Sequence, residues 1–214
     1  MTENRRTAAS TWLPFLPSRA IVMAKRPKQA VPSTQEKPCS SCGLSSNSAK
    51  AVQGNGPKNA RLMLVTDVPN AQEEIEGRPL VGDAGQLLTK MIEAIGLKRD
   101  QVYITAIVKC RPADDRAPTE AETQACSQQL LEEIETVRPQ VILSLGKFAS
   151  QTLLKTETAI SDLRGRFHSF RGARLMPTFH PGYLLRNPSS KREAWADLQL
   201  VAAELGIKIS KEKL

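Results

Sequence analysis

The stretch Arg61-Leu-Met-Leu-Val-Thr-Asp-Val-Pro69 is a short apolar run that ends in a polar turn. An apolar run of this length, bounded by a proline, predicts a buried β-strand over residues 61–65, followed by a turn that carries Asp67. Working outward along the chain, three similar runs predict further strands, over residues 101–108, 141–145 and 175–178.

Segments with helical periodicity separate these strands. Thr119 and Glu122 form a capping-box pattern, which predicts the start of a long helix that Pro139 ends. The predicted helices cover residues 84–95, 119–137, 146–154 and 190–205. Strands that alternate with helices of this length predict an α/β fold, a three-layer α/β/α arrangement with a central, mainly parallel four-stranded sheet.

Ligands in such folds bind beyond the carboxyl ends of the strands. The chain segments that follow the predicted strand ends are therefore the candidate site segments: 66–83, 106–118, 146–148 and 179–188.

Charge and composition predict the domain organisation. Of the 214 residues, 30 are Lys or Arg and 22 are Asp or Glu, a net charge of +8 that is compatible with a polyanionic partner. Residues 1–37 are basic and interrupted by prolines, which predicts an unstructured extension before a domain over 38–207 and a tail over 208–214. No segment predicts a membrane span or an export signal, so we expect a cytoplasmic, nucleoid-associated monomer.

Four cysteines in two distant pairs suggest one four-ligand site. Cys39 and Cys42 form a Cys-x-x-Cys, whereas Cys110 and Cys126 lie far downstream and sixteen positions apart. Zinc fingers and ribbons usually place their second pair as close together as the first, so an iron–sulfur cluster fits this spacing better than zinc. Two disulfides, or four unrelated buried thiols, are the alternatives, and nothing in the sequence suggests the oxidising compartment that disulfides require.

From Cys39 to about Val201 the chain resembles the family 4 uracil-DNA glycosylases, the iron–sulfur, thermophile-type branch. The matching stretches are Cys39-x-x-Cys42, Gly77-Arg-Pro-Leu-Val-Gly82, Ala84-Gly-Gln-Leu-Leu88, Val102-Tyr-Ile-Thr105, Val108-Lys-Cys-Arg-Pro112, Arg164-Gly-Arg166 and Thr178-Phe-His-Pro-Gly-Tyr-Leu-Leu-Arg186. The resemblance implies a DNA repair enzyme that flips a damaged nucleotide out of single- or double-stranded DNA and hydrolyses its N-glycosidic bond. It also implies a structural [4Fe-4S] cluster on the four cysteines.

The resemblance implies catalytic roles for three residues. Asp67 stands at the position of the family's water-orienting carboxylate, Glu73 matches a supporting carboxylate, and His180 matches the histidine that donates a hydrogen bond to the departing base. The alternative interpretations from the residues alone are a solvated turn carboxylate for Asp67, a helix-start acid for Glu73 and a structural histidine for His180.

The chain departs from the family pattern in the expected base pocket, which the resemblance assigns to Thr66, Val68, Pro69, Leu80 and Ala106. Leu80 replaces the phenylalanine on which the family stacks the flipped base, and stacking on an aromatic side chain contributes about 1–3 kcal/mol per base. Ala106 replaces an asparagine that reads the uracil edge. Thr66 replaces a glycine of the first motif, in which only Pro69 matches outright.

The last matching stretch implies a DNA-binding loop. Tyr183, Leu184 and Leu185 resemble the wedge that fills the gap left by a flipped base, and Arg186 and Lys147 are expected to contact phosphates. Packing of the two leucines into the core is the alternative. The sequence thus predicts a DNA glycosylase, with a catalytically weak or inactive DNA-binding member of the same superfamily as the second hypothesis. A redox role for the cluster is a third hypothesis with little support.

Overall fold

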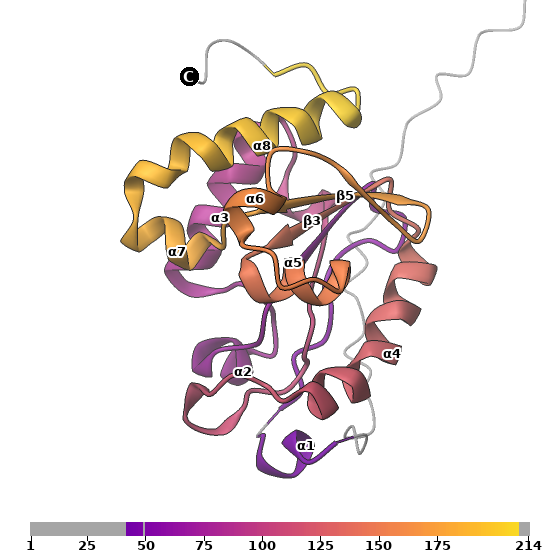
Figure 1. Ribbon diagram of the computed structural model, residues 1–214, viewed down its shortest axis with the longest axis vertical. Coiled ribbons are helices and arrows are strands. Elements are labelled where there is room, and N and C mark those ends of the chain that lie inside the picture. The colour runs from indigo at the N-terminus through magenta and orange to yellow at the C-terminus, as the bar shows by residue number, and fades with distance from the viewer. Residues whose placement is uncertain (1–41, 49, 210–214) are drawn as a thin grey trace, which may run out of the picture. The chain divides into compact units, whose positions relative to one another are not determined.

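The structure, a computed structural model, describes residues 42–48 and 50–209 (Figure 1). The expected extension over 1–37, Cys39 and the last five residues lie outside the described residues. One sheet runs in the order β2-β1-β3-β5-β4 and is parallel except for β4, which confirms the predicted α/β fold with a mainly parallel sheet. The strands are β1 Leu62–Thr66, β2 Tyr103–Ala106, β3 Val141–Leu145, β4 His168–Phe170 and β5 Ala173–Thr178.

The prediction of four strands was wrong by one, because β4 adds a fifth at the edge of the sheet. β4 runs antiparallel to β5, with His168 opposite Leu175. The turn between them places Arg171 and Gly172 in the left-handed region, with φ of 46° and 84°. Three residues are too few to show a periodic apolar pattern, so the stretch that contains His168 was not counted among the predicted strands of the sheet.

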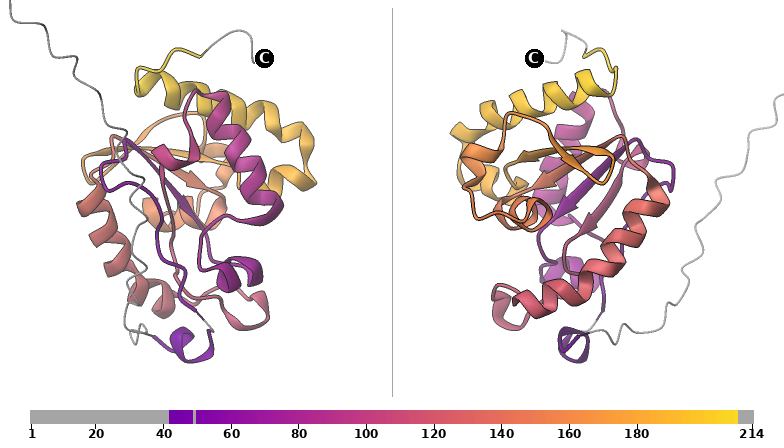
Figure 2. Two further views of the ribbon diagram at one scale, coloured as in Figure 1. Left: turned by 180° about the vertical axis from the view of Figure 1, so that it is seen from behind. Right: turned by 45° about the vertical axis from the view of Figure 1, so that its right-hand side comes forward.

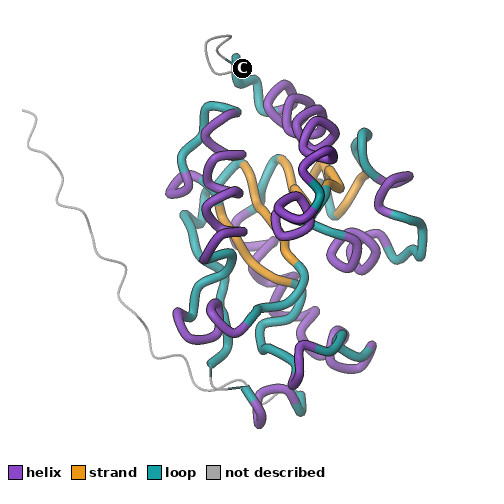
Figure 3. The backbone as a smooth tube through the Cα atoms, turned by 90° about the vertical axis from the view of Figure 1, so that its left-hand side faces the viewer, coloured by secondary structure: helices purple, strands orange, loops and turns teal. Residues whose placement is uncertain are grey.

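The sheet separates two apolar layers. In β1, Leu62 and Leu64 face one layer while Met63 and Val65 face the other, as the alternation of side chains along a strand requires. Helices α3 (Gly82–Ala94) and α8 (Lys191–Glu204) cover the first face, and α4 (Glu120–Val137) and α5 (Lys147–Leu154) cover the second. Figure 2 shows α3 and α8 together on one side of the strands, and Figure 3 shows strands between layers of helices.

All four predicted helices are present within two residues of their predicted ends, and the capping box of Thr119 and Glu122 starts α4 as expected. In the part of the chain that the structure describes, the shorter α-helices are α1 Leu44–Asn47, α2 Ala71–Glu76, α6 Ile160–Leu163 and α7 Pro181–Arg186. Nowhere in 42–48 and 50–209 does a helix combine the length and apolar composition that crossing a membrane requires.

A lysine with no exposed side-chain surface joins β2 to α4. The Lys109 ammonium lies 2.6 Å from a carboxylate oxygen of Glu133 on α4, and it also donates to the Thr105 hydroxyl and the Ala106 carbonyl at the end of β2. The second carboxylate oxygen of Glu133 accepts from the Gly54 amide at 3.2 Å. One buried ion pair therefore fixes the end of β2, the middle of α4 and the loop before β1.

Replacement of Lys109 by Met should destabilise the fold by about 3–5 kcal/mol, because it leaves a mostly buried carboxylate without its counter-charge. Urea unfolding followed by circular dichroism measures this loss. The matched control is Arg171→Gln, which removes an exposed ion pair to Glu135 on the same helix (3.8 Å) and should change stability by less than about 1 kcal/mol. A loss below about 1 kcal/mol for Lys109→Met would contradict the role assigned to the pair.

Candidate active site at the carboxyl edge of the sheet

Asp67 follows the last residue of β1 and contacts the start of α5. Its Oδ1 accepts a hydrogen bond of 2.7 Å from the Ala149 amide in the first turn of α5. Burial raises the pKa of Asp67 from 3.8 to about 6, while the hydrogen bond from Ala149 opposes the rise. Asp67 is therefore a desolvated carboxylate that is ionised at neutral pH. It is not the solvated turn carboxylate of the alternative interpretation.

Gly146, between β3 and α5, is closely approached by the side chains of Asp67 and His180. A Cβ atom at this position would lie 2.9 Å from Asp67 Oδ2 and 3.2 Å from His180 Cβ, and the φ of Gly146 is 103°. Only glycine combines this backbone conformation with so close an approach. Asp67 and His180, which are 113 positions apart in the chain, are thus both close to Gly146 at the ends of β1, β3 and β5.

His180 is neutral, and its hydrogen bonds define its tautomer. It is the N-cap residue of α7, where its Nδ1 accepts from the Gly182 amide at 3.0 Å. Burial, with a smaller contribution from the Arg186 cation, lowers the pKa of His180 to about 4. Because Nδ1 accepts, the ring proton is on Nε2, which donates to the Thr66 hydroxyl at 3.0 Å. The imidazole therefore presents an N–H donor toward the end of β1.

Two of the expected base-pocket residues lie side by side. Thr66 and Ala106 are register partners at the ends of β1 and β2, and both are buried. Leu80 is also buried, but as part of the apolar layer beneath α3 and α8, and its φ of 52° is left-handed. Val68 is partly buried against the opposite layer and Pro69 is buried. The structure therefore brings Thr66, Ala106 and His180 together, while Leu80 is buried in the apolar layer that α3 and α8 cover.

Glu73 accepts hydrogen bonds from backbone amides of the same region. One carboxylate oxygen accepts from the Asn70 amide at 2.7 Å and completes a capping box at the start of α2, while the other accepts from the Leu80 amide. Burial raises the pKa of Glu73, and these amides oppose the rise. Glu73 is thus a helix-start acid, as the second interpretation of the sequence held, and it also connects α2 to the segment that carries Leu80.

The segment expected to form a DNA-binding loop is the short helix α7. Pro181 occupies its first position, where the missing N–H costs nothing. Tyr183 and Leu185 are 39% and 42% exposed, but Leu184 is 1% exposed and packs in the core. Because the segment is helical, the side chain of Leu184 points into the core. The assignment of Leu184 to the wedge was therefore wrong. The side chains of Lys147 and Arg186 are exposed, as expected of groups that contact phosphate.

A buried ion pair that sequence reasoning missed supports the strand that leads to His180. Asp197 on α8 is fully buried and accepts two hydrogen bonds from the Arg164 guanidinium, at 2.9 and 3.0 Å. It also accepts from the hydroxyl of Thr178, the last residue of β5, at 2.7 Å. The same guanidinium lies 5.4 Å from the centroid of the Phe179 ring. The two residues that precede His180 are therefore fixed by side chains from outside the sheet.

Three of the four cysteines lie within the described residues. Cys110 and Cys126 are buried in the apolar layer beneath α4 and α5, and Cys42 is partly buried against the same layer. Within 42–48 and 50–209, however, no group of three or more His, Cys, Asp or Glu residues is arranged to hold a metal ion. The thiols thus share one apolar environment, which is compatible with a common cluster, but the described residues alone do not form a metal centre.

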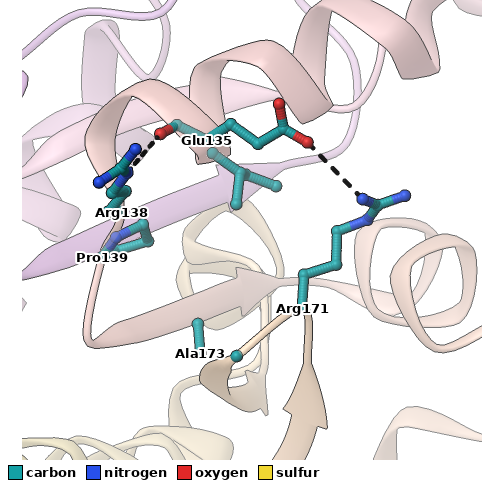
Figure 4. Close-up of a pocket in the computed structure, with 7 residues that line it drawn as sticks. Glu135, Arg138, Pro139, Arg171 and Ala173 are labelled. Atoms are coloured by element: carbon teal, nitrogen blue, oxygen red, sulfur yellow. Dashed lines mark hydrogen bonds and ion pairs between the residues drawn. The ribbon is translucent and has the colours of Figure 1, made fainter.

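A pocket of about 510 Å³ lies away from these residues. It is formed by the end of α4, the start of β3 and the β4–β5 turn, and is lined by Glu135, Arg138, Pro139, Arg171 and Ala173 among others (Figure 4). Arg171 pairs with Glu135, and Arg138 donates to the Glu135 carbonyl at 3.2 Å. Because this pocket lies at the amino ends of β3 and β5, it is separate from the candidate active site.

Comparison with known proteins gives consistent matches. The model of the uracil DNA glycosylase superfamily matches residues 53–199. The type-4 uracil-DNA glycosylase of Saccharolobus solfataricus is 38% identical over 79% of this chain and 83% of its own length, and that of Thermotoga maritima is 40% identical over 74% and 84%. The type-5 uracil-DNA glycosylase of Pyrobaculum aerophilum is 36% identical over 60% of this chain and 64% of its own length.

The raised pKa of Asp67 predicts a pH-dependent effect of Asp67→Asn on stability. A carboxyl whose folded-state pKa exceeds its unfolded value contributes stability that is complete below the unfolded pKa and lost as the pH rises through the folded pKa. Asn does not ionise, so the stability of the variant relative to wild type should increase between pH 4 and 7, by about 1–3 kcal/mol.

Urea unfolding at pH 4, 5, 6 and 7 measures this difference. The matched control is Asp83→Asn, which removes an exposed carboxylate in the first turn of α3 and should shift the difference by less than about 0.5 kcal/mol. A stability difference for Asp67→Asn that stays constant from pH 4 to 7 would refute the desolvation of this carboxylate.

Proposed function

The chain belongs to the uracil DNA glycosylase superfamily, and on that premise we propose that it hydrolyses the N-glycosidic bond of a flipped, damaged base, uracil or another deaminated base, in DNA. The observation that supports this function best is that an ionised Asp67 and a neutral His180 both approach the Cβ position of Gly146. Glycosidic bond hydrolysis needs a base-side hydrogen-bond donor and a group that orients water, and these two residues supply them.

His180 acts on the leaving base. As the bond between the base nitrogen and C1′ breaks, negative charge develops on the base, including its carbonyl oxygen. The Nε2–H of His180 donates a hydrogen bond to that oxygen, in place of the bond it makes to the Thr66 hydroxyl in the free protein. A neutral imidazole suits this role, because it stabilises the anion without requiring protonation at physiological pH.

Asp67 acts on the water that attacks C1′. A water oxygen forms the new bond to C1′ while the bond to the base breaks, and the carboxylate of Asp67 orients the water and takes its proton. The hydrogen bond from Ala149 holds one carboxylate oxygen and leaves Oδ2 to accept from the water. Glu73 supports this geometry through the backbone of residues 70 and 80.

The pocket residues argue for weak discrimination between bases. Ala106 has no amide to read a base edge, and such a bidentate contact contributes about 1–3 kcal/mol of discrimination. The alternative, a catalytically weak or inactive DNA-binding member of the superfamily, has less support, because Asp67 and His180 keep the arrangement that the reaction requires.

DNA is the partner that this function implies. Tyr183 and Leu185 are the exposed apolar residues of α7 and are suited to fill the gap left by a flipped nucleotide, with Lys147 and Arg186 on phosphates. The proposal takes the protein to be a monomer in the cytoplasm, associated with the nucleoid.

The four cysteines are proposed to hold a [4Fe-4S] cluster. Cys42, Cys110 and Cys126 contribute thiols from one apolar layer, and Cys39 is the natural fourth ligand because it forms a Cys-x-x-Cys with Cys42. A bound cluster would supply structural cross-linking of the segment before β1, the loop after β2 and helix α4. No part of the proposed reaction involves it.

Single-turnover excision assays test the function. Wild-type protein should release uracil faster from single-stranded and mispaired sites than from paired ones, because an unpaired base is easier to flip. His180→Ala should lower the rate by about 100-fold or more, the usual loss when a donor to a developing anion is removed. The rate should rise with pH up to about 6, as Asp67 ionises, and then level off.

The control for this assay is His168→Ala, which removes the other histidine. His168 lies on the edge strand β4 and its ring is hydrogen-bonded to the Leu163 carbonyl, so the substitution should leave the rate within about threefold. Ala106→Asn should raise the preference for uracil by about tenfold, the effect of one amide–base contact. Tight DNA binding without release of uracil, hypoxanthine or xanthine would favour the non-cleaving alternative.

Anaerobically purified protein should be brown and contain iron and acid-labile sulfide. Replacing Cys110 or Cys126 by Ser should remove the colour and lower the melting temperature, because each thiolate is a ligand. Visible absorption with metal analysis and thermal unfolding measure the two effects, and Ser127→Ala, at the residue after Cys126 on α4, is the control. Stoichiometric zinc without iron or sulfide would exclude the cluster.

A further inference from the structure

Leu80 has an unusual backbone conformation for its size. Its φ of 52° lies in the left-handed region, which L-residues with large side chains rarely occupy. It lies in the segment that joins α2 to α3, and its side chain is 2% exposed. Such a conformation persists only where surrounding contacts hold it, so the contacts of Leu80 identify what determines the shape of this segment.

Two oppositely charged side chains hold the backbone of Leu80. Its amide donates to the carboxylate of Glu73, and its carbonyl accepts a hydrogen bond of 2.7 Å from the Arg99 guanidinium. The same Nη2 of Arg99 donates to the Pro79 carbonyl at 3.0 Å. Nη1 donates to the Gly85 carbonyl and the Thr89 hydroxyl, both at 3.3 Å. One guanidinium thus connects the 79–80 segment to the first two turns of α3.

The space around the Leu80 carbonyl is closed on the side of α3. A Cβ atom at Gly85 would lie 2.0 Å from that carbonyl oxygen, so the carbonyl rests directly on the backbone of the helix. Arg99 itself precedes β2 and reaches the segment across a cleft of about 450 Å³ that Leu80 and Gly85 also line. The planar fork of a guanidinium suits these four acceptors, because it holds two donor nitrogens apart, whereas the compact ammonium of a lysine would reach only some of them.

We propose that Arg99 is a positioning residue for the base pocket, which holds the 79–82 segment in the strained conformation that places Leu80. The inference rests on the proposed function and on the expected place of Leu80 in the base pocket. Glu73 accepts from the amides of both Asn70, directly after Pro69, and Leu80, so the 79–82 segment is tied to the loop that carries Asp67. Among the described residues, the hydrogen bonds that Arg99 donates go to backbone carbonyls and one hydroxyl of this segment and of α3, and it acts on the reaction through Leu80. Without it, Leu80 is free to return to negative φ, and the segment shifts.

Hydrogen exchange and kinetics together test the proposal. Arg99→Gln should speed amide exchange of Leu80, Val81 and the first turn of α3 by about tenfold or more, while β3 and α5 exchange at their wild-type rates. The excision rate at saturating DNA should fall by about 10–100-fold, the effect of a displacement near 1 Å, with affinity for undamaged DNA unchanged within about twofold. Arg99→Lys should rescue part of the loss. Arg78→Gln, which removes an exposed cation from the same segment, is the matched control and should change neither readout.

A double-mutant cycle separates positioning from general stability. Leu80→Gly removes the backbone strain, so Arg99→Gln should cost much less excision activity in that background than in wild type. The proposal would be overturned if the losses of excision activity were additive in the cycle. It would also be overturned if Arg99→Gln left the amide exchange of Leu80 unchanged, or raised amide exchange equally throughout the core. If the wild-type protein released no damaged base, the proposed function would fail, and the exchange of Leu80 and the first turn of α3 would still decide whether Arg99 holds the segment.

Discussion

A single buried ammonium, that of Lys109, is the constraint on which the rest of the structure depends. It has no exposed surface and must therefore be neutralised and fully hydrogen-bonded, and Glu133, Thr105 and the Ala106 carbonyl meet that requirement. These partners belong to β2 and α4, and Lys109 itself belongs to the loop beyond β2. Helix α4, which carries Cys126, and the loop that carries Cys110 are thus fixed to the same point as Ala106 of the expected base pocket. A shift of any of them would separate the buried charges of Lys109 and Glu133.

The active site uses burial in two opposite ways. Desolvation raises the pKa of the carboxylate of Asp67 and lowers that of the imidazole of His180, so that at neutral pH the first is charged and the second is neutral. The fold produces both shifts with ordinary elements: a strand end, a glycine at Gly146 that permits close approach, and a proline-started helix whose Gly182 amide defines the tautomer. Parallel strands that end at one edge bring these residues together from distant parts of the chain.

Sequence patterns predicted the parts of the structure that periodic burial determines. The apolar run from Leu62 to Val65 and the capping box at Thr119 both appear as expected. β4 was missed because three residues carry no period, and Leu184 was misplaced because a loop and a helix direct the same side chain differently. The bond between His180 and Thr66 spans 114 positions, and Arg99 lies in a turn with no motif. Contacts of that kind follow from the assembled fold and not from any local pattern.

The hydrogen bond between Thr66 and His180 has a consequence for how the protein searches DNA. A buried N–H without an acceptor costs about 1–3 kcal/mol, so a site that kept its donor unpaired between substrates would be destabilised for most of its lifetime. Here the protein supplies its own acceptor when no base is bound, so the vacant site carries no such penalty. A base that enters must replace the Thr66 hydroxyl as the acceptor of the hydrogen bond from His180. While the protein moves along undamaged DNA, the Nε2–H of His180 therefore already has an acceptor.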